Sequence, residues 1–265
     1  MSKETVTWMS ERLEREITLV RWGEVGTPVL VFPTAGGDAE EIERFHLVTA
    51  VGAYLADGKA KLYSVDSLAG RAWFTEDNSS GPATNIQNRF DSTIYNEVLP
   101  AIRKDCGDDE IEIVTAGASL GAYNALAFLC RHPDVCKAAI CMSGTYGLER
   151  FIDGPVTDDY YHVSPLHFVP DLDEDGDHLK QLRERFVLLT HGEGEAEDPN
   201  ESWRVANVLG KRGIPNRVDS WGEDWRHDWV TWREMLPKYM GELLGAESTE
   251  DAAQDDAAAG DATSA

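Results

Sequence analysis

The residues with the clearest chemical potential lie in the segment GASLG, residues 117–121. A strand-like apolar run at 111–114 precedes this segment, and a helix-like run at 119–131 overlaps its end. A Gly-x-Ser-x-Gly pattern in such a place is typical of a nucleophile elbow, a sharp turn that exposes the serine hydroxyl between small neighbours. We therefore expect Ser119 to be a nucleophile at a helix N-terminus, where N–H groups favour developing negative charge. The alternative is a purely structural glycine turn.

A serine nucleophile needs a general base and a carboxylate that orients the base. His227 lies in the predicted turn between the last strand, 218–221, and the last helix, 229–244. Where a nucleophile elbow is present, the base follows the serine and the acid along the chain. We therefore expect His227 to be the base. The alternative is a surface histidine in a turn.

The orienting acid is expected in the loop that follows the strand at 186–190. Four carboxylates stand there within six residues, namely Glu193, Glu195, Glu197 and Asp198. Spacing alone does not choose among them, and at least two should belong to a solvated acidic surface. Asp228 adjoins His227, but the side chains of neighbouring residues diverge, so we expect it to be a poor partner for the histidine.

These residues require a framework that holds them together. Strand-like runs lie at 17–20, 29–32, 61–65, 111–114, 137–142, 186–190 and 218–221, and helix-like runs lie at 39–55, 86–103, 119–131, 201–211 and 229–244. Such alternation predicts a mostly parallel sheet with helices on both faces, a three-layer α/β/α fold. One irregular, lid-like excursion is expected at about 145–185.

The end of the chain differs in composition from the rest. Residues 246–265 contain six acidic residues, no basic residue and no apolar periodicity, which predicts a disordered tail after one domain at 1–245.

Charge is the most unusual bulk property of this chain of 265 residues. Its 48 acidic and 24 basic residues give a formal net charge of −24, which disfavours nucleic acids and anionic membranes as partners. The sequence lacks an apolar run long enough to span a membrane and its N-terminus lacks the apolar centre of a secretory signal, so we expect a cytoplasmic protein. An acidic, lysine-poor surface is also typical of proteins in concentrated salt, with an ordinary acidic cytosolic protein as the alternative.

The sequence contains no convincing metal-binding pattern. None of the four cysteines forms a Cys-x-x-Cys pair: they are Cys106, Cys130, Cys136 and Cys141. The aspartate-rich segment at 171–176 begins like a calcium loop, but Leu182 stands where such a loop needs its last carboxylate. We therefore expect neither a metal nor an organic cofactor.

Several motifs together resemble the putative esterase (esterase D-like) family of the α/β hydrolase superfamily. They are GASLGAYNAL (117–126), RHPD (131–134), MSG (142–144), GIP (213–215), WG (221–222) and HDWxxWR (227–233). That family includes S-formylglutathione hydrolase, feruloyl esterases and mycolyltransferases, and the resemblance covers about residues 28–239. It implies an α/β hydrolase fold with Ser119 as the nucleophile and His227 as the base.

The resemblance also bears on the choice of the acid. The commoner Gly-x-x-Asp arrangement of the family would place the acid at Glu195, whereas a similar branch shows Gly-x-Gly-x-x-Glu. The second pattern maps onto Gly192, Gly194 and Glu197. We expect Glu197 to be the acid, with Glu195 and Asp198 as alternatives.

Acyl transfer further requires an oxyanion hole made of N–H groups. One donor is expected to be the backbone N–H group of Leu120, directly after the nucleophile. The other is expected in the loop after the strand at 29–32, where PTA (33–35) replaces the His-Gly-x turn of the family, which points to Ala35.

The sequence therefore favours a serine carboxylic-ester hydrolase that acts on a small-molecule ester through an acyl-enzyme intermediate. One alternative is an acyltransferase that uses the same triad. The other is a non-catalytic α/β hydrolase scaffold that binds a partner.

Overall fold

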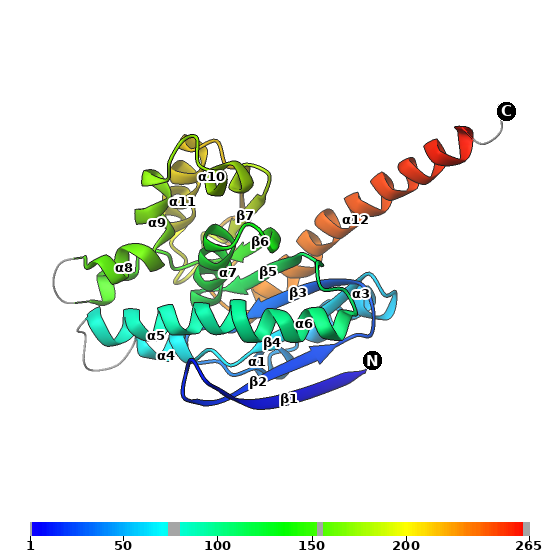
Figure 1. Cartoon of the computed structure of the whole chain (residues 1–265). Helices are drawn as coiled ribbons and strands as arrows, with labels where there is room; N and C mark the ends of the chain where they lie inside the picture. Colours follow the sequence, from blue (N-terminus) through cyan, green and yellow to red (C-terminus); the bar gives the residue numbers. More distant parts are fainter. Residues whose placement is uncertain (1, 74–79, 153–155, 262–265) are drawn as a thin grey trace.

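A twisted sheet forms the centre of the molecule, and the computed structural model describes residues 2–73, 80–152 and 156–261 (Figure 1). Within these residues the sheet has eight strands in the order β1-β2-β4-β3-β5-β6-β7-β8. The strands are β1 (Lys3–Ser10), β2 (Arg15–Trp22), β3 (Thr27–Phe32), β4 (Ala60–Val65), β5 (Ile113–Ala118), β6 (Cys136–Met142), β7 (Phe186–His191) and β8 (Asn216–Ser220). The strands from β3 to β8 are parallel, whereas β1 pairs antiparallel with β2, and β2 with β4. The predicted mostly parallel sheet is confirmed.

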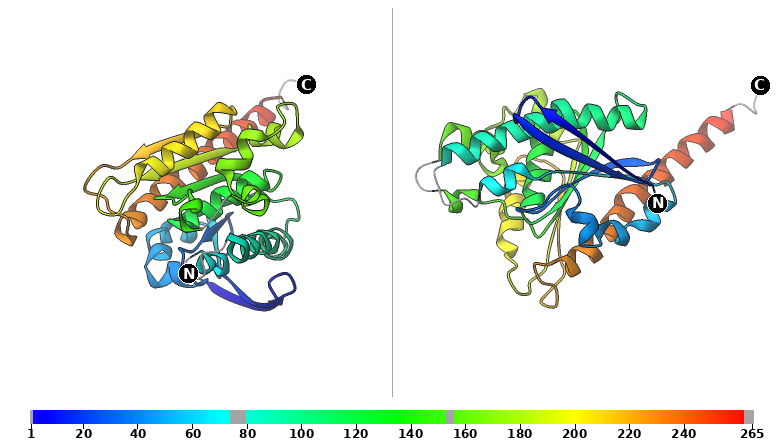
Figure 2. Two further views of the ribbon diagram at one scale, coloured as in Figure 1. Left: turned by 90° about the vertical axis from the view of Figure 1, so that its left-hand side faces the viewer. Right: turned by 90° about the horizontal axis from the view of Figure 1, so that it is seen from below.

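Helices cover both faces of the sheet. They are α1 (Glu41–Arg44), α2 (Leu47–Ala50), α3 (Gly52–Ala56), α4 (Leu68–Ala72), α5 (Ser80–Thr93), η1 (Ile94–Val98), α6 (Leu99–Cys106), α7 (Leu120–Arg131), η2 (Leu148–Phe151), α8 (Asp158–Val163), α9 (Pro165–Phe168), η3 (Val169–Asp171), α10 (Asp177–Leu182), α11 (Pro199–Lys211) and α12 (Trp229–Asp261). Seen from below, the sheet lies between two helical layers (Figure 2).

The two layers follow from the alternation of side chains along the buried strands. In β3, Leu30 and Phe32 belong to the hydrophobic core beneath α5, α6, α7 and α11. Val29 and Val31 belong to a second core, shared with α1–α3 and the first part of α12. Because successive side chains of a strand point to opposite faces, the strands from β2 to β7 contribute to both cores. The predicted three-layer α/β/α architecture is therefore confirmed.

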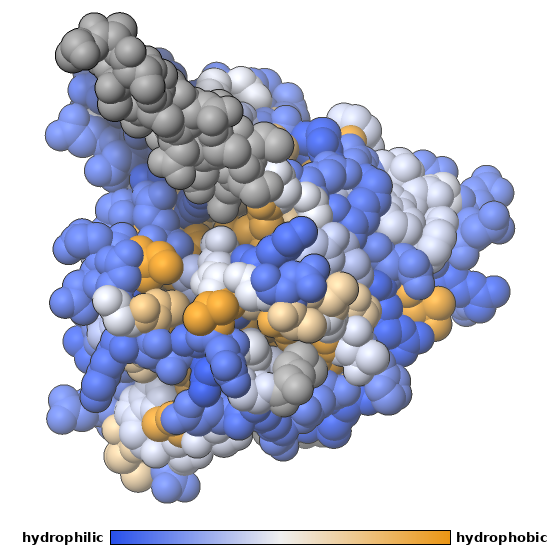
Figure 3. Space-filling view, turned by 90° about the vertical axis from the view of Figure 1, so that its right-hand side faces the viewer, coloured by the Kyte–Doolittle hydropathy of each residue, from blue (hydrophilic) through white to orange (hydrophobic). Residues whose placement is uncertain are grey.

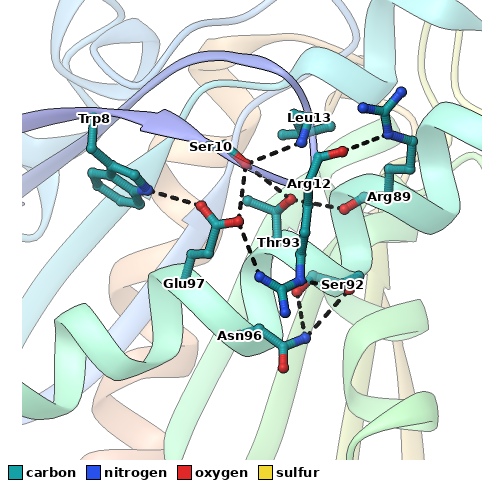
Figure 4. A network of polar contacts seen from close by, with 9 residues as sticks. All are labelled: Trp8, Ser10, Arg12, Leu13, Arg89, Ser92, Thr93, Asn96 and Glu97. Atoms are coloured by element: carbon teal, nitrogen blue, oxygen red, sulfur yellow. Dashed lines mark hydrogen bonds and ion pairs between the residues drawn. The ribbon is translucent and has the colours of Figure 1, made fainter.

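Strand β1 is absent from the sequence prediction. Six of its eight residues, Lys3 to Thr7 and Met9, are exposed, so the apolar pattern that reveals a strand is missing. Pairing with β2 and a polar network hold it in place (Figure 4). In that network the Glu97 carboxylate accepts hydrogen bonds from Trp8 Nε1 at 2.9 Å, Ser10 Oγ at 3.1 Å and Arg12 Nη1 at 3.3 Å.

Two long predicted helices are interrupted in the structure. The run at 39–55 forms three short helices, because His46 adopts a left-handed conformation with φ of 63° at the start of α2. The run at 86–103 lies within α5, η1 and α6, and the π-helical turn η1 carries Glu97 toward β1. The second interruption serves a contact with a distant strand, which helical periodicity alone does not reveal.

The excursion at 145–185 is more regular than expected. Its described residues include η2, α8, α9, η3 and α10, and some of their side chains, such as Tyr160 and Leu179, are fully buried against the domain. The role of this segment as a lid stays a prediction.

The boundary of the acidic tail also stays a prediction. Helix α12 begins at Trp229 and continues to Asp261, so it includes most of the segment for which we expected disorder.

Hydrophilic residues cover most of the face seen in Figure 3, and the hydrophobic ones lie in small groups between them. Within the described part of the chain, no helix combines the length and the apolar character that crossing a membrane requires.

Candidate active site

Ser119 lies in a strained turn between β5 and α7. Its φ of 56° is in the left-handed region, which costs energy for any residue with a side chain. The turn is also too tight for side chains on either side of the serine. A Cβ atom on Gly117 would lie 2.3 Å from the carbonyl oxygen of Gly121, and one on Gly121 would lie 2.3 Å from that of Phe32. The backbone therefore has the shape of a nucleophile elbow.

The predicted oxyanion donors, Leu120 and Ala35, belong to the two segments that pack together at Gly121. Leu120 is the first residue of α7, and Gly121 packs against the carbonyl groups of Phe32 and Pro33, where the Ala35 loop begins. The loop is anchored by the buried Glu41 carboxylate, which accepts hydrogen bonds from the Thr34 N–H group at 2.8 Å and the Thr34 hydroxyl at 2.7 Å. Ala35 itself is half-buried. The structure thus places the Ala35 loop directly beside the nucleophile turn.

The loops that carry the predicted acid and base are joined backbone to backbone. The N–H groups of Glu193 and Gly194 donate to the carbonyl oxygens of Gly222 and Trp225, both at 2.9 Å. The N–H group of His227 donates to the Glu195 carbonyl oxygen at 3.1 Å. These hydrogen bonds fix the position of the His227 backbone relative to the acid loop.

Glycine is required where the two loops touch. A Cβ atom at Gly192 would lie 2.0 Å from the Trp225 carbonyl oxygen, and one at Gly194 would lie 2.7 Å from the same atom. The Gly-x-Gly pattern therefore has a steric cause, because any side chain would separate the acid loop from the histidine loop.

Glu197 is the carboxylate that the structure brings to His227. The distance from Glu197 Oε2 to His227 Nδ1 is 3.8 Å. The side chain of Glu197 is 1% exposed, and that of His227 is 23% exposed. Ala196, with φ of 63°, turns the chain so that the next side chain points inward. Glu197 is thus placed to orient His227 through Nδ1, which leaves Nε2 for a proton transfer.

The other carboxylates of the loop have different partners. Glu195 is 77% exposed and pairs with Arg226 at 3.2 Å, and Glu193 accepts a hydrogen bond from Ser220 Oγ at 2.6 Å. Asp198 is the N-cap of α11 and accepts from the Asn200 N–H group at 3.2 Å. The structure brings neither alternative acid, Glu195 or Asp198, into contact with the His227 ring.

Asp228 has a separate structural role. Its carboxylate accepts a hydrogen bond from the Thr231 N–H group at 3.0 Å, at the start of α12. It therefore caps the last helix and does not orient His227.

The strand ends bring the nucleophile to the same edge of the sheet. In the register of β5 and β6, Ala118 lies opposite Met142, so Ser119 and Ser143 both follow neighbouring strand ends. The Thr145 N–H group donates to the Ser119 carbonyl oxygen at 3.2 Å. This loop after β6 connects the nucleophile turn with Glu197, because the Ser143 hydroxyl donates to Glu197 Oε1 at 2.5 Å.

Two residues of the site had no role in the sequence prediction, Ser143 and Trp232. Trp232 Nε1 donates to Ser143 Oγ at 3.0 Å, and the Trp232 ring meets the His227 ring edge to face at 5.2 Å between centroids. The available signal was their presence in the MSG and HDWxxWR motifs. A motif does not tell which atoms meet, so their contacts were not predictable.

Metal-binding groups are absent from the part of the chain that the structure describes: no three His, Cys, Asp or Glu side chains lie close enough to hold an ion there. All four cysteines are free thiols, and three of them are buried. Burial raises the pKa of Cys130 and Cys136 far above the ordinary value and that of Cys141 to about 12.

Known structures share this architecture at low sequence identity. A ferulic acid esterase aligns with a TM-score of 0.71 and 17% identity, over 92% of this chain and 98% of that chain. An S-formylglutathione hydrolase from Agrobacterium tumefaciens aligns with a TM-score of 0.68 and 12% identity, over 92% and 94%. A fluorophosphonate-binding serine hydrolase from Staphylococcus aureus aligns with a TM-score of 0.58 and 12% identity, over 92% and 98%. At such identities these likenesses establish the α/β hydrolase fold.

The family of this protein is identified by a match between its sequence and the sequence model of a protein family. The model described as "Putative esterase" matches residues 39–243, which include Ser119, Glu197 and His227. No curated protein matches the chain in sequence. Because the family model spans most of the chain, this protein belongs to the putative esterase family and is an esterase with the α/β hydrolase fold.

Proposed function

We propose that this protein is a serine carboxylic-ester hydrolase that acts on a small-molecule ester through a Ser119–His227–Glu197 triad. The observation that carries the proposal is the placement of the buried Glu197 carboxylate 3.8 Å from His227 Nδ1, beside a strained Ser119 turn. An acid that holds Nδ1 keeps the proton on that nitrogen and leaves Nε2 free to act as a base.

The reaction begins when Ser119 Oγ attacks the ester carbonyl carbon and His227 Nε2 takes the hydroxyl proton. The negative charge on the carbonyl oxygen is stabilised by the N–H groups of Leu120 and Ala35. The tetrahedral intermediate then expels the alcohol, which receives the proton from His227. Water attacks the acyl-enzyme with the same base, and the carboxylic acid leaves as Ser119 regains its proton.

The first test compares the wild type with Ser119→Ala in the hydrolysis of p-nitrophenyl acetate and longer acyl esters. We expect kcat to fall by about 10⁴-fold or more in the variant. Equal rates for the two proteins would remove Ser119 from the mechanism. Assays in dilute buffer and in molar KCl also test the proposed adaptation to salt, and an added alcohol distinguishes hydrolysis from acyl transfer.

A second comparison tests the choice of the acid. Glu197→Gln keeps the shape of the side chain and removes its charge, so we expect kcat to fall by about 10³- to 10⁴-fold. Glu195→Gln is the matched control two residues away, and we expect it to stay within about twofold of the wild type because Glu195 is exposed and pairs with Arg226. The opposite ranking would assign the role to Glu195.

A further inference from the structure

We infer that Ser143 is a positioning residue that holds the Glu197 carboxylate aimed at His227, an inference that rests on the proposed function. Ser143 follows β6, and the whole residue is only 3% exposed. Its hydroxyl lies between two groups of the site, 3.0 Å from Trp232 Nε1 and 2.5 Å from Glu197 Oε1.

The chemistry of the three groups gives this contact a single direction. An indole N–H group can only donate, an ionised carboxylate can only accept, and a serine hydroxyl does both with one proton. Trp232 Nε1 occupies a lone pair of the Ser143 oxygen, so the Ser143 proton points to Glu197. Because each donor polarises the next, the hydrogen bond on the carboxylate is strengthened.

Glu197 needs such a donor because its side chain is almost completely buried. One of its oxygens faces His227, and the other accepts the hydrogen bond from Ser143. A buried carboxylate oxygen without a hydrogen-bond donor is costly, and the Ser143 hydroxyl supplies that donor. The Ser143 hydroxyl also fixes the rotation of the carboxylate, so that Oε2 stays toward Nδ1 of His227.

The backbone of Ser143 shows that the hydroxyl is present at a cost to the fold. Its φ of 46° lies in the left-handed region, where glycine would be more stable. The Ser143 N–H group donates to the Thr190 carbonyl oxygen at 2.7 Å, which holds the strained residue against β7. A serine where the backbone prefers glycine is consistent with a role for the side chain in activity.

The test uses Ser143→Gly, which removes the hydroxyl and relieves the backbone. A purely structural serine at this place predicts a variant at least as stable as the wild type and fully active. The positioning role predicts an unchanged or higher melting temperature together with a kcat about 10- to 100-fold lower and a KM within about threefold. Glu14→Gly is the matched control, because Glu14 has φ of 54° in an exposed turn between β1 and β2, and it should leave kcat unchanged.

A double-mutant cycle shows whether Ser143 acts through Glu197. In the Glu197→Gln background, Ser143→Gly should change kcat by less than about threefold, because the charge that it serves is already gone. The inference is overturned if Ser143→Gly keeps kcat within about twofold of the wild type, or if its loss multiplies fully with that of Glu197→Gln.

The rate at which a fluorophosphonate probe labels Ser119 gives a readout that does not depend on the ester chosen. Slower labelling of Ser143→Gly than of the wild type supports the positioning role. Equal labelling of these two proteins, with Ser119→Ala unlabelled, overturns the role of Ser143 and leaves the proposed function standing. A wild type that resists the probe and the esters as completely as Ser119→Ala would overturn the proposed function itself.

Discussion

A methyl group at Gly121 should separate the two halves of the oxyanion site. The Cβ atom of an alanine would lie 2.3 Å from the Phe32 carbonyl oxygen and 2.7 Å from that of Pro33, whereas ordinary contacts begin near 3.4 Å. Both obstacles are backbone atoms, so a rotamer change cannot remove them. The nucleophile turn and the loop that leads to Ala35 must therefore move apart by roughly 1 Å.

The expected effect of Gly121→Ala is a large loss of kcat with a moderate loss of stability. A displacement of about 1 Å at a reacting group costs about 10²-fold in rate, and the loss of one oxyanion donor costs about 10²- to 10³-fold. Overpacking of this kind costs about 1–3 kcal/mol of unfolding free energy, which corresponds to roughly 3–10 °C in melting temperature for a domain of this size.

The assay measures kcat for p-nitrophenyl acetate and the melting temperature by circular dichroism. Gly52→Ala in α3 is the matched control, because a Cβ atom there meets nothing within 4 Å. The control should keep the wild-type kcat and gain up to about 1 kcal/mol of stability. A Gly121→Ala variant with wild-type kcat and melting temperature would refute the close contact between the nucleophile turn and the Ala35 loop.

Three further predictions concern groups away from the site. Asp105→Asn should lower the free energy of unfolding, measured by urea denaturation, by about 2 kcal/mol. The substitution leaves the buried Lys61 ammonium without the carboxylate that lies 2.7 Å away. Because Asp105 is about one-third exposed, the loss should be smaller than for a fully buried pair. Burial opposes ionisation of Asp105, but hydrogen bonds from Lys61 and Tyr63 outweigh it and hold its pKa below the usual range. A carboxyl group whose pKa is lowered by folding stabilises the folded state above its unfolded pKa of about 3.9. The difference in unfolding free energy between wild type and Asp105→Asn should therefore persist at pH 7 and vanish as the pH falls through the folded pKa. A difference that is unchanged at pH 3 would contradict this prediction. An aromatic disulfide reagent at pH 8 should label Cys106 in the native protein. It should label the three buried thiols, Cys130, Cys136 and Cys141, only after unfolding. Rapid labelling of all four cysteines in the native protein would contradict this burial.

The elements that the sequence predicted are those with a local pattern. The parallel strands from β3 to β7 are mostly apolar, buried runs, and the predicted nucleophile turn has its glycines and serine within five residues. Strand β1 was missed because six of its residues are exposed and its anchor, Glu97, lies about ninety residues away in the chain. The predicted helix at 39–55 was too long because the backbone is left-handed at His46, a break that the apolar periodicity does not encode.

The residues of the candidate site also differ in how far the sequence alone predicts their positions. The sequence by itself determined that Ser119 stands in an elbow and that His227 lies in the last turn before the final helix, because both depend on neighbouring residues. Spacing did not choose among four carboxylates within six residues, which have the same chemistry, and only the resemblance to the esterase family favoured Glu197. Only the tertiary structure decided that Glu197 turns inward: backbone hydrogen bonds join the acid loop to the histidine loop, and Ser143, fifty-four residues earlier in the chain, holds the carboxylate. Contacts between distant segments depend on the packing of the whole sheet, and this is why the contacts of Glu197 with His227 and Ser143 appear only in the folded chain.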